Sequence, residues 1–206
     1  MRLSELVAAA AAVSAAGGLA WAEPVVTFAD GPGTTQGGIY IATTDEFGVF
    51  DTFCLETGEG LTTGFTYEYT ISTDIMFKGQ GIVDPLNEET AFLYTEFREG
   101  DIPDLLGDPG IDIVDLANAI QLAIWFIEES RATDDANALE LVQIAQDAVN
   151  SGQWDGLGDV RVMNVWDPGH VGEEDHAKQD VLVLIPAPSA LALAALGILG
   201  VSRRRS

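Results

Sequence analysis

Two residues in this sequence have side chains that could react with each other. Cys54 is the only cysteine of the 206-residue chain and lies in the stretch VFDTFCLETGEG. Gln121 is a polar residue near the middle of the most apolar helical stretch, NAIQLAIWFIEE. A thiol that attacks a glutamine side-chain carbonyl, with loss of ammonia, forms an internal thioester. The two side chains must then be in contact, in a site dry enough to slow hydrolysis, and Trp125 and Phe53 are candidates for its apolar wall.

Other interpretations of these residues stay open. A lone cysteine often behaves as a small buried apolar residue, and an odd cysteine in a secreted chain also allows an intermolecular disulfide. A cysteine hydrolase would need a histidine base, and the two histidines, His170 and His176, both lie in the polar stretch DPGHVGEEDHAKQD. Gln121 would equally be explained by an amide hydrogen-bonded to the backbone of a neighbouring strand, since a buried amide without partners is costly.

The elements that must position these residues follow from hydrophobic periodicity and from turn residues. Strands are expected at residues 25–28, 38–43, 49–56, 64–73, 159–166 and 179–185. Helices are expected at residues 87–100, 111–130 and 133–152. Strands that surround a helical segment predict an α+β domain. We expect β-sandwich-like strands with an inserted segment of about three helices.

The helix boundaries can also be predicted. Asn87 and Thr133 are the expected N-caps of the first and third helices. The apolar positions of the second helix run nearly all round it, which predicts burial on most sides. The third helix carries an apolar stripe, which consists of Leu139, Val142, Ala145 and Val149.

The N-terminus has the pattern of a secretory signal peptide. Arg2 is followed by an almost entirely Ala, Val and Leu run over residues 6–19, and Ala20-Trp21-Ala22 then forms a small-x-small cleavage site. We therefore expect residues 1–22 to be removed by signal peptidase and the folded domain to span residues 23–185. The run is too short for a transmembrane anchor to be the preferred interpretation.

The C-terminus, residues 186–206, has three parts. They are a short motif (Pro186, Ala187, Pro188), an apolar run expected to be helical (190–201) and a basic cluster (Arg203, Arg204, Arg205). A plain tail anchor is one interpretation. The three-part order resembles the PEP-CTERM sorting signal of Gram-negative bacteria, with Ala where that motif has Glu. The resemblance implies transient anchoring in the inner membrane, processing by an exosortase, and a final location at the cell surface or in the extracellular matrix.

The charge of the chain limits the kinds of partner that it is expected to bind. There are 33 acidic and nine basic residues, which gives a formal net charge of −24. All but one of the acidic residues and only five of the basic ones lie within the expected domain. Binding of nucleic acid needs a basic face, and so does binding to anionic lipid. Neither is expected as a partner of the domain.

The residues around Cys54 and Gln121 resemble a known family. FCLE (53–56) and IQLAIW (120–125) resemble the motifs of the thioester domains of bacterial surface proteins, except that Ile120 stands where the second motif has Thr. The resemblance implies Cys54 as the thiol and Gln121 as the acyl donor, and the supporting positions are Phe53, Glu56, Ala123 and Trp125. It implies a covalent adhesin that reacts once with an amine-bearing surface or matrix partner, and therefore not an enzyme. The alternative is a structural biofilm or matrix protein in which Cys54 and Gln121 are only core residues.

No metal or cofactor site is assigned from the sequence. The aspartates of DEFGVFD and GDPGIDIVD leave calcium open, but they lack the spacing of an EF-hand, and Asp112 and Asp115 more simply begin the long helix. No phosphate loop, zinc-ligand spacing or dinucleotide fingerprint is present, and no pair of carboxylates is singled out for acid–base catalysis. No cofactor is therefore expected.

Overall fold

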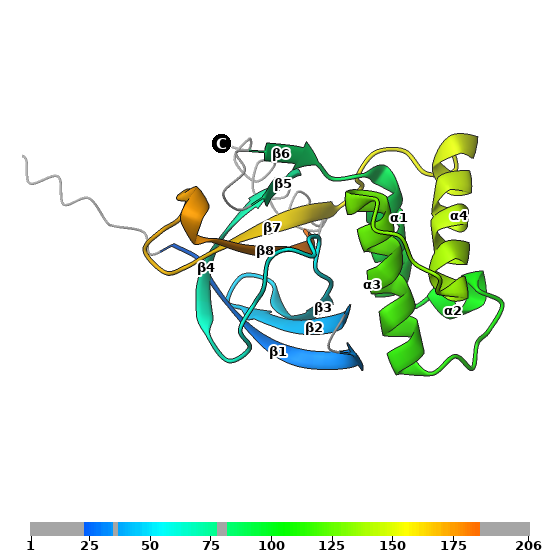
Figure 1. Ribbon diagram of the computed structural model, residues 1–206, viewed down its shortest axis with the longest axis horizontal. Coiled ribbons are helices and arrows are strands. Elements are labelled where there is room, and N and C mark those ends of the chain that lie inside the picture. The colour runs from blue at the N-terminus through cyan, green and yellow to red at the C-terminus, as the bar shows by residue number, and fades with distance from the viewer. Residues whose placement is uncertain (1–22, 35–36, 78–81, 186–206) are drawn as a thin grey trace, which may run out of the picture.

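The computed structural model describes residues 23–34, 37–77 and 82–185, and it contains eight strands and four α-helices in these ranges (Figure 1). The strands are β1 (Val25–Thr34), β2 (Gly37–Thr44), β3 (Gly48–Thr52), β4 (Thr66–Ser72), β5 (Asp74–Phe77), β6 (Ile82–Pro85), β7 (Val160–Trp166) and β8 (Ala177–Leu184). The helices are α1 (Glu88–Glu99), α2 (Ile102–Leu105), α3 (Ile113–Glu129) and α4 (Ala136–Ser151), and a 3₁₀ turn, η1 (Glu174–His176), precedes β8.

The predicted signal peptide (1–22) and sorting tail (186–206) lie outside the described residues. Within the described part of the chain, no helix is both long and apolar enough to cross a bilayer.

Six strands form one antiparallel sheet in the order β3-β2-β1-β4-β7-β8. This sheet curls until its two edges meet. The chain beyond β3 pairs with β8 through the bridge Cys54–Val181, and the amide of Leu55 donates to the carbonyl of Asp180 at 3.0 Å. The strands are thus one curled sheet rather than the two stacked sheets of the expected sandwich. The sequence analysis had extended the β3 strand to residue 56, and it is this extension that closes the sheet.

Strand alternation divides the buried side chains into two cores. The first core fills the curled sheet and contains Val26, Phe28, Ala42, Phe50, Tyr67, Tyr69, Met163, Val165, Val181 and Val183. The second lies between the sheet and the helices and includes Phe53, Leu55, Ile120, Ile124, Leu141, Val162 and Leu182. The segment after β3 belongs to the second core, so its backbone lies where the sheet meets the helices.

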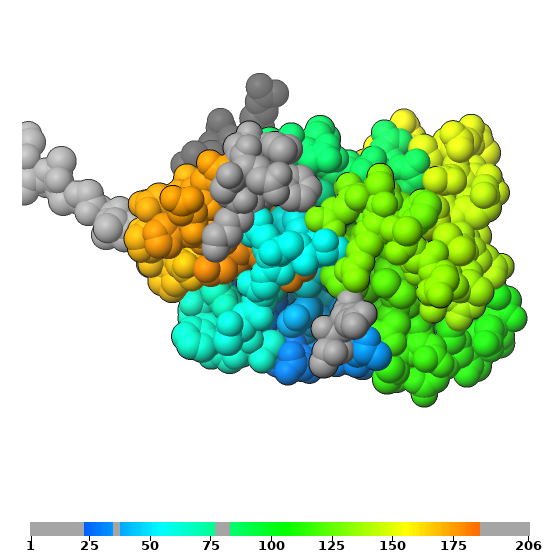
Figure 2. All heavy atoms as spheres, in the orientation of Figure 1, coloured from blue at the N-terminus to red at the C-terminus, as the bar shows by residue number. Residues whose placement is uncertain are grey.

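The helices gather on one side of the molecule, with α3 packed against β1, β2 and α4 (Figure 1). Figure 2 shows the helices, in green to yellow, and the strands meeting in one continuous surface. Most of α3 is buried, as its apolar periphery predicts, and Asp112 caps it by accepting a hydrogen bond from the amide of Val114 at 2.9 Å. This cap orients the helix that carries Gln121.

Two local predictions about α4 were wrong, and the N-cap position predicted for α1 is confirmed. Asp135, not Thr133, is the N-cap of α4, because its carboxylate accepts from the amide of Ala138 at 2.8 Å. Leu139 is 42 % exposed and so lies outside the buried stripe. Asn87 is the N-cap residue of α1 but makes no capping bond with its side chain, which donates to Glu128 instead.

Two short elements were not predicted. The β5–β6 hairpin pairs residues 74–77 with 82–85, where no strand is expected from the sequence. Helix α2 is a single turn between two expected helices. Strands β5 and β6 and helix α2 are each four residues long, too short for periodicity to indicate.

Candidate functional site

The side chain of Gln121 lies against the backbone of Cys54. The amide of Cys54 donates to Oε1 of Gln121 at 3.0 Å, and Nε2 of Gln121 donates to the carbonyl of Cys54 at 2.7 Å. The carboxamide thus pairs with the peptide as a neighbouring strand would. Because Cys54 lies on the segment that closes the sheet and Gln121 on the buried face of α3, the fold itself brings these residues together across 67 positions of sequence.

Cys54 and Gln121 are buried but border a pocket. Their exposed fractions are 2 % and 0 %. Burial raises the pKa of the Cys54 thiol well above its ordinary value, and the neighbouring Glu56 adds to the shift. The pocket has a volume of about 520 Å³, and Trp125 and Arg131 also line it. The thiol is therefore buried, with a pocket beside it.

The four supporting positions have different surroundings. Trp125 lines the pocket, and the Arg131 guanidinium lies 4.7 Å from the centroid of its ring. Phe53 does not form the opposite wall that the sequence suggested. Its ring packs against Phe97 with the centroids 4.9 Å apart, in the core next to the helices. Ala123 is fully buried on α3, in the same core.

Glu56 belongs to a buried pair of carboxyl groups. Its Oε2 accepts a hydrogen bond from the amide of Asp180 at 2.8 Å, whereas its Oε1 is buried without a hydrogen-bond partner among the described residues. Burial raises the pKa of Glu56 well above its usual range, and the nearby carboxylates of Asp180 and Glu59 raise it further. Burial also raises the pKa of Asp180 to about 7. The pair therefore holds protons that exposed carboxyl groups would have lost at neutral pH.

The other polar groups of Asp180 fix this strand in place. Its Oδ2 accepts from the amide of Met76 and from Nδ2 of Asn164, both at 2.7 Å. Asp180 thereby joins β5, β7 and β8 beside the point where the sheet closes, so it holds in position the strand that pairs with Cys54.

Both histidines lie away from Cys54. His170 and His176 stand in the β7–β8 connection, where they contact each other, Glu173 and Asp167. Neither is among the residues that line the pocket. The base that a cysteine hydrolase requires is therefore not found beside Cys54 in the described part of the chain.

Two of the aspartates in the stretches that left calcium open have structural roles. Asp112 caps α3, and Oδ1 of Asp108 accepts from the amide of Gly110 at 3.1 Å in the turn before it. These bonds account for both side chains without a cation.

The sequence analysis missed Gln179 and Arg131. Gln179 is 5 % exposed, lines the pocket and donates from Nε2 to the carbonyl of Glu56. Its sequence signal was the pair Gln179-Asp180 at the start of a very apolar strand, which is the same kind of signal that singled out Gln121. Arg131 carried no signal, because its position over Trp125 depends on how the chain leaves α3.

Comparison of the chain with known protein families gives no match, and comparison with curated proteins gives none either. Among solved structures, the fold is similar to the N-terminal thioester domain of fibronectin-binding protein SfbI from Streptococcus pyogenes. The TM-score is 0.47 at 11 % sequence identity, and the alignment covers 80 % of this chain and 95 % of that one.

Proposed function

We propose that this chain is an exported surface protein that attaches covalently to its partner through an internal thioester between Cys54 and Gln121. One observation carries the proposal. The carboxamide of Gln121 is held against the backbone of Cys54 by two hydrogen bonds, in a buried site. The only cysteine of the chain and a buried glutamine are thus neighbours, through contacts between the Gln121 side chain and the Cys54 backbone.

The reaction balances without any co-reactant. The Cys54 sulfur attacks Cδ of Gln121, the new S–C bond replaces the C–N bond of the amide, and the thiol proton leaves with ammonia. A partner amine then attacks the same carbon. An amide forms between Gln121 and the partner, and the thiol of Cys54 is regenerated. The product is a permanent link, so the reaction occurs once per chain.

The surroundings of the site suit an uncharged sulfur. Burial raises the pKa of the free thiol and so disfavours the thiolate. A thioester, like the neutral thiol, carries no charge and is compatible with these surroundings. The pocket beside Cys54 and Gln121 gives an amine a place to enter. Ile120 stands where the family motif has Thr, and it is buried in the helical core. In this chain the amide is positioned by the Cys54 backbone instead.

The test is the intact mass of the domain, residues 23–185, which contains every described element. We expect a mass lower than the sequence mass by one ammonia, and we expect methylamine to add to the protein stoichiometrically. A peptide digest should contain a crosslinked pair with Cys54 in one peptide and Gln121 in the other. The unmodified mass, with a thiol that alkylates after denaturation, would exclude the thioester.

Matched variants identify the acyl donor. Cys54→Ala and Gln121→Ala should each restore the sequence mass and abolish methylamine addition. Gln179→Ala is the control, because Gln179 is a second buried glutamine that lines the same pocket. If the ammonia deficit survives Gln121→Ala and disappears in Gln179→Ala, the donor has been assigned to the wrong glutamine.

A structural role is the second candidate, and the same two hydrogen bonds favour it. The Gln121 amide is fully satisfied by the Cys54 peptide, which is sufficient to explain a polar residue inside an apolar helix. In this case the domain is a passive surface or matrix component, and the intact mass equals the sequence mass.

The sequences of the two terminal segments support the proposed export. Residues 1–22 are expected to be cut by signal peptidase and residues 186–206 by an exosortase. Expression of the full chain in a Gram-negative host with and without an exosortase tests both. We expect a mature N-terminus at Glu23 in both hosts, and release from the inner membrane only where the exosortase is present. Retention in the membrane of both hosts would contradict the sorting proposal.

A further inference from the structure

In the connection between β7 and β8, a residue whose side chain can bind a metal ion recurs at every third position. In DPGHVGEEDH these residues are Asp167, His170, Glu173 and His176. The backbone makes a hydrogen bond across each interval. The amide of His170 donates to the carbonyl of Asp167 at 3.1 Å, that of Glu173 to His170 at 3.0 Å, and that of His176 to Glu173 at 2.8 Å.

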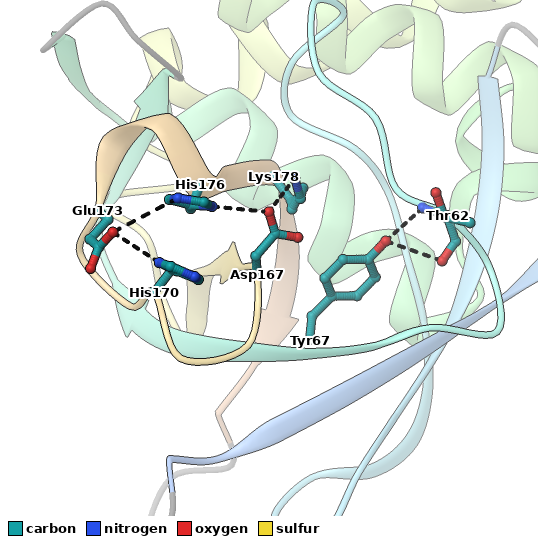
Figure 3. Close-up of polar contacts among 7 residues, drawn as sticks. All are labelled: Thr62, Tyr67, Asp167, His170, Glu173, His176 and Lys178. Carbon is teal, nitrogen blue, oxygen red and sulfur yellow. Dashed lines mark hydrogen bonds and ion pairs between the residues drawn. The ribbon is translucent and has the colours of Figure 1, made fainter.

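These consecutive turns bring the four side chains to one side of the loop. The last turn is the 3₁₀ turn η1, whereas the first two pass through Gly169 and Gly172. Gly169 and Gly172, between the ligand-bearing residues, have φ values of 81° and 83°, which glycine adopts readily. Figure 3 shows the four side chains converging. The imidazole rings of His170 and His176 stack with their centroids 3.7 Å apart and an angle of 15° between their planes.

The distances within this group suit a small cation. Oε2 of Glu173 lies 2.9 Å from Nδ1 of His170 and 3.9 Å from Nε2 of His176. One ligand atom from each of the three residues lies within 4.8 Å of the other two. Tetrahedral zinc with bonds of about 2.0–2.1 Å places its ligand atoms about 3.3 Å apart. One observed separation is shorter and the other longer than that value, and the nearly parallel imidazole rings must rotate out of their stack to direct both nitrogens at one ion.

The surrounding groups orient one of the two imidazoles. Nδ1 of His176 lies 3.4 Å from Oδ2 of Asp167, and the same oxygen is 2.8 Å from Nζ of Lys178. A histidine that donates from one ring nitrogen to a carboxylate presents its other nitrogen to a metal in the correct tautomer. Asp167 thus leaves Nε2 of His176 facing Glu173 (Figure 3).

We propose that His170, Glu173 and His176 form a binding site for a divalent transition-metal ion of the zinc type, with Asp167 as the residue that orients His176. Two imidazoles and one carboxylate favour zinc over calcium or magnesium, which prefer oxygen ligands alone. The side chains are 38–61 % exposed, so an ion reaches them from solvent. Three protein ligands leave a fourth position for water or for a group from a partner.

Calorimetric titration of Zn²⁺ into the chain, purified without a polyhistidine tag, tests the site. We expect one saturable site per chain and no binding of Ca²⁺ at the same concentration. His170→Ala and Glu173→Gln should abolish the one-site isotherm, and Asp167→Asn should weaken it about 10-fold or more. The matched control is Glu140→Gln on the exposed face of α4, which removes the same charge and should leave the isotherm unchanged.

A second measurement does not depend on any variant. The chain has only two histidines, so the ring nitrogens of both are readily assigned by NMR. Both rings should shift on addition of one equivalent of Zn²⁺. Graded uptake without saturation, equal uptake by wild type and the His170→Ala variant, or imidazole signals that do not move would each overturn the site.

Discussion

At the scale of single residues, the contact between Gln121 and Cys54 explains why the most apolar helix of the chain contains a glutamine. The segment after β3 turns the amide and the carbonyl of Cys54 toward α3. The carboxamide of Gln121 provides one acceptor and one donor. The same two bonds hold the carboxamide of Gln121 against the backbone of Cys54, and the proposed thioester would release the Nε2 donor and with it the bond to the Cys54 carbonyl.

The first prediction concerns the cost of removing this pairing. Gln121→Leu leaves the amide and the carbonyl of Cys54 buried without partners, and we expect a loss of about 2–4 kcal/mol in the free energy of unfolding. Urea unfolding measures it. Gln143→Leu, on the exposed face of α4, should change stability by less than about 0.5 kcal/mol.

Cys54→Ala separates the hydrogen bonds from a crosslink in the same experiment. This variant removes any thioester but keeps the Cys54 backbone and therefore both bonds to Gln121. Its stability gives the cost of losing the crosslink and the thiol, and the difference from Gln121→Leu gives the contribution of the pairing. Equal stabilities for Gln121→Leu and Gln143→Leu would show that the pairing contributes nothing.

The second prediction concerns the buried carboxyl pair, Glu56 and Asp180. Burial raises both pKa values, that of Asp180 to about 7. The folded chain therefore binds more protons than the unfolded chain above about pH 4, where exposed carboxyl groups titrate. The stability that this pair contributes is fully present below about pH 4 and is lost as the pH rises through the folded pKa values, of which that of Asp180 is about 7.

Glu56→Gln tests that sign. Glutamine keeps an oxygen to accept from the Asp180 amide and cannot ionise. At pH 8 we expect this variant to be more stable than wild type by about 1–3 kcal/mol, and at pH 4 to be about equal to it. Glu140→Gln removes the same charge at an exposed position and is the control. A Glu56→Gln variant that is less stable than wild type at pH 8 would show that the ionised carboxylate is favoured in the folded chain.

At the scale of elements, α3 determines where Gln121 lies. Its C-terminal end has an unfavourable backbone conformation. Ser130 follows the helix with φ of 55°, the one positive value among the non-glycine residues of the described chain. A side chain in this left-handed conformation costs about 1 kcal/mol that glycine does not incur.

The third prediction follows from this conformation. Ser130→Gly should raise the free energy of unfolding by about 0.5–1 kcal/mol, measured by urea unfolding. Ser151→Gly, inside the last turn of α4, should instead lower it by a similar amount, because that serine is helical. The two variants must shift in opposite directions. If both destabilise, the end of α3 is not strained as described.

The sequence predicted the elements well where their periodicity was strong and poorly where tertiary contacts decide. The long helices were found because they carry sustained apolar patterns. The cap of α4 was misplaced because Thr133 and Asp135 are both good caps, and only the structure shows that Thr133 accepts from the Asp135 amide. The side chain of Asn87 reaches Glu128, 41 residues away, and no local pattern contains that contact.

The candidate site, too, could be predicted from the sequence only in part. Cys54 and Gln121 could be paired from the sequence because each was chemically unusual on its own. The partnership of Glu56 with Asp180 could not, because 124 residues separate them and the chain has many acids. The ligand-bearing residues of the β7–β8 connection recur at a readable interval of three. Their convergence, however, depends on turns that a polar loop sequence does not specify.

At the scale of the whole molecule, a compact curled sheet carries a very large negative charge. The net charge is −24, and nearly all of the acidic residues lie in the folded domain. Repulsion among like charges destabilises the compact state relative to the expanded one. The same charge repels other acidic surfaces. The proposed covalent link would hold a partner that electrostatic attraction does not retain.

The last prediction concerns the salt dependence of folding. Raising NaCl from 10 mM to 150 mM shortens the Debye length from about 30 Å to about 8 Å, which screens repulsion between charges on different elements. We expect a gain of about 1 kcal/mol, which is roughly 2–4 °C in the thermal midpoint of a domain of this size. The experiment is run with EDTA, so that a metal in the β7–β8 connection does not contribute.

A variant with less charge distinguishes repulsion from other effects of salt. Glu99→Gln, Glu140→Gln and Asp155→Asn, all at exposed positions, remove three negative charges from the helical side. The triple variant should have a higher midpoint than wild type at 10 mM NaCl and should gain less on addition of salt, because it starts with less repulsion to screen. A wild-type midpoint that stays constant or falls with salt would mean that the folded chain already disperses its charge as well as the unfolded chain does. Equal slopes for the two proteins would mean that salt acts on the apolar core and not on the acidic surface.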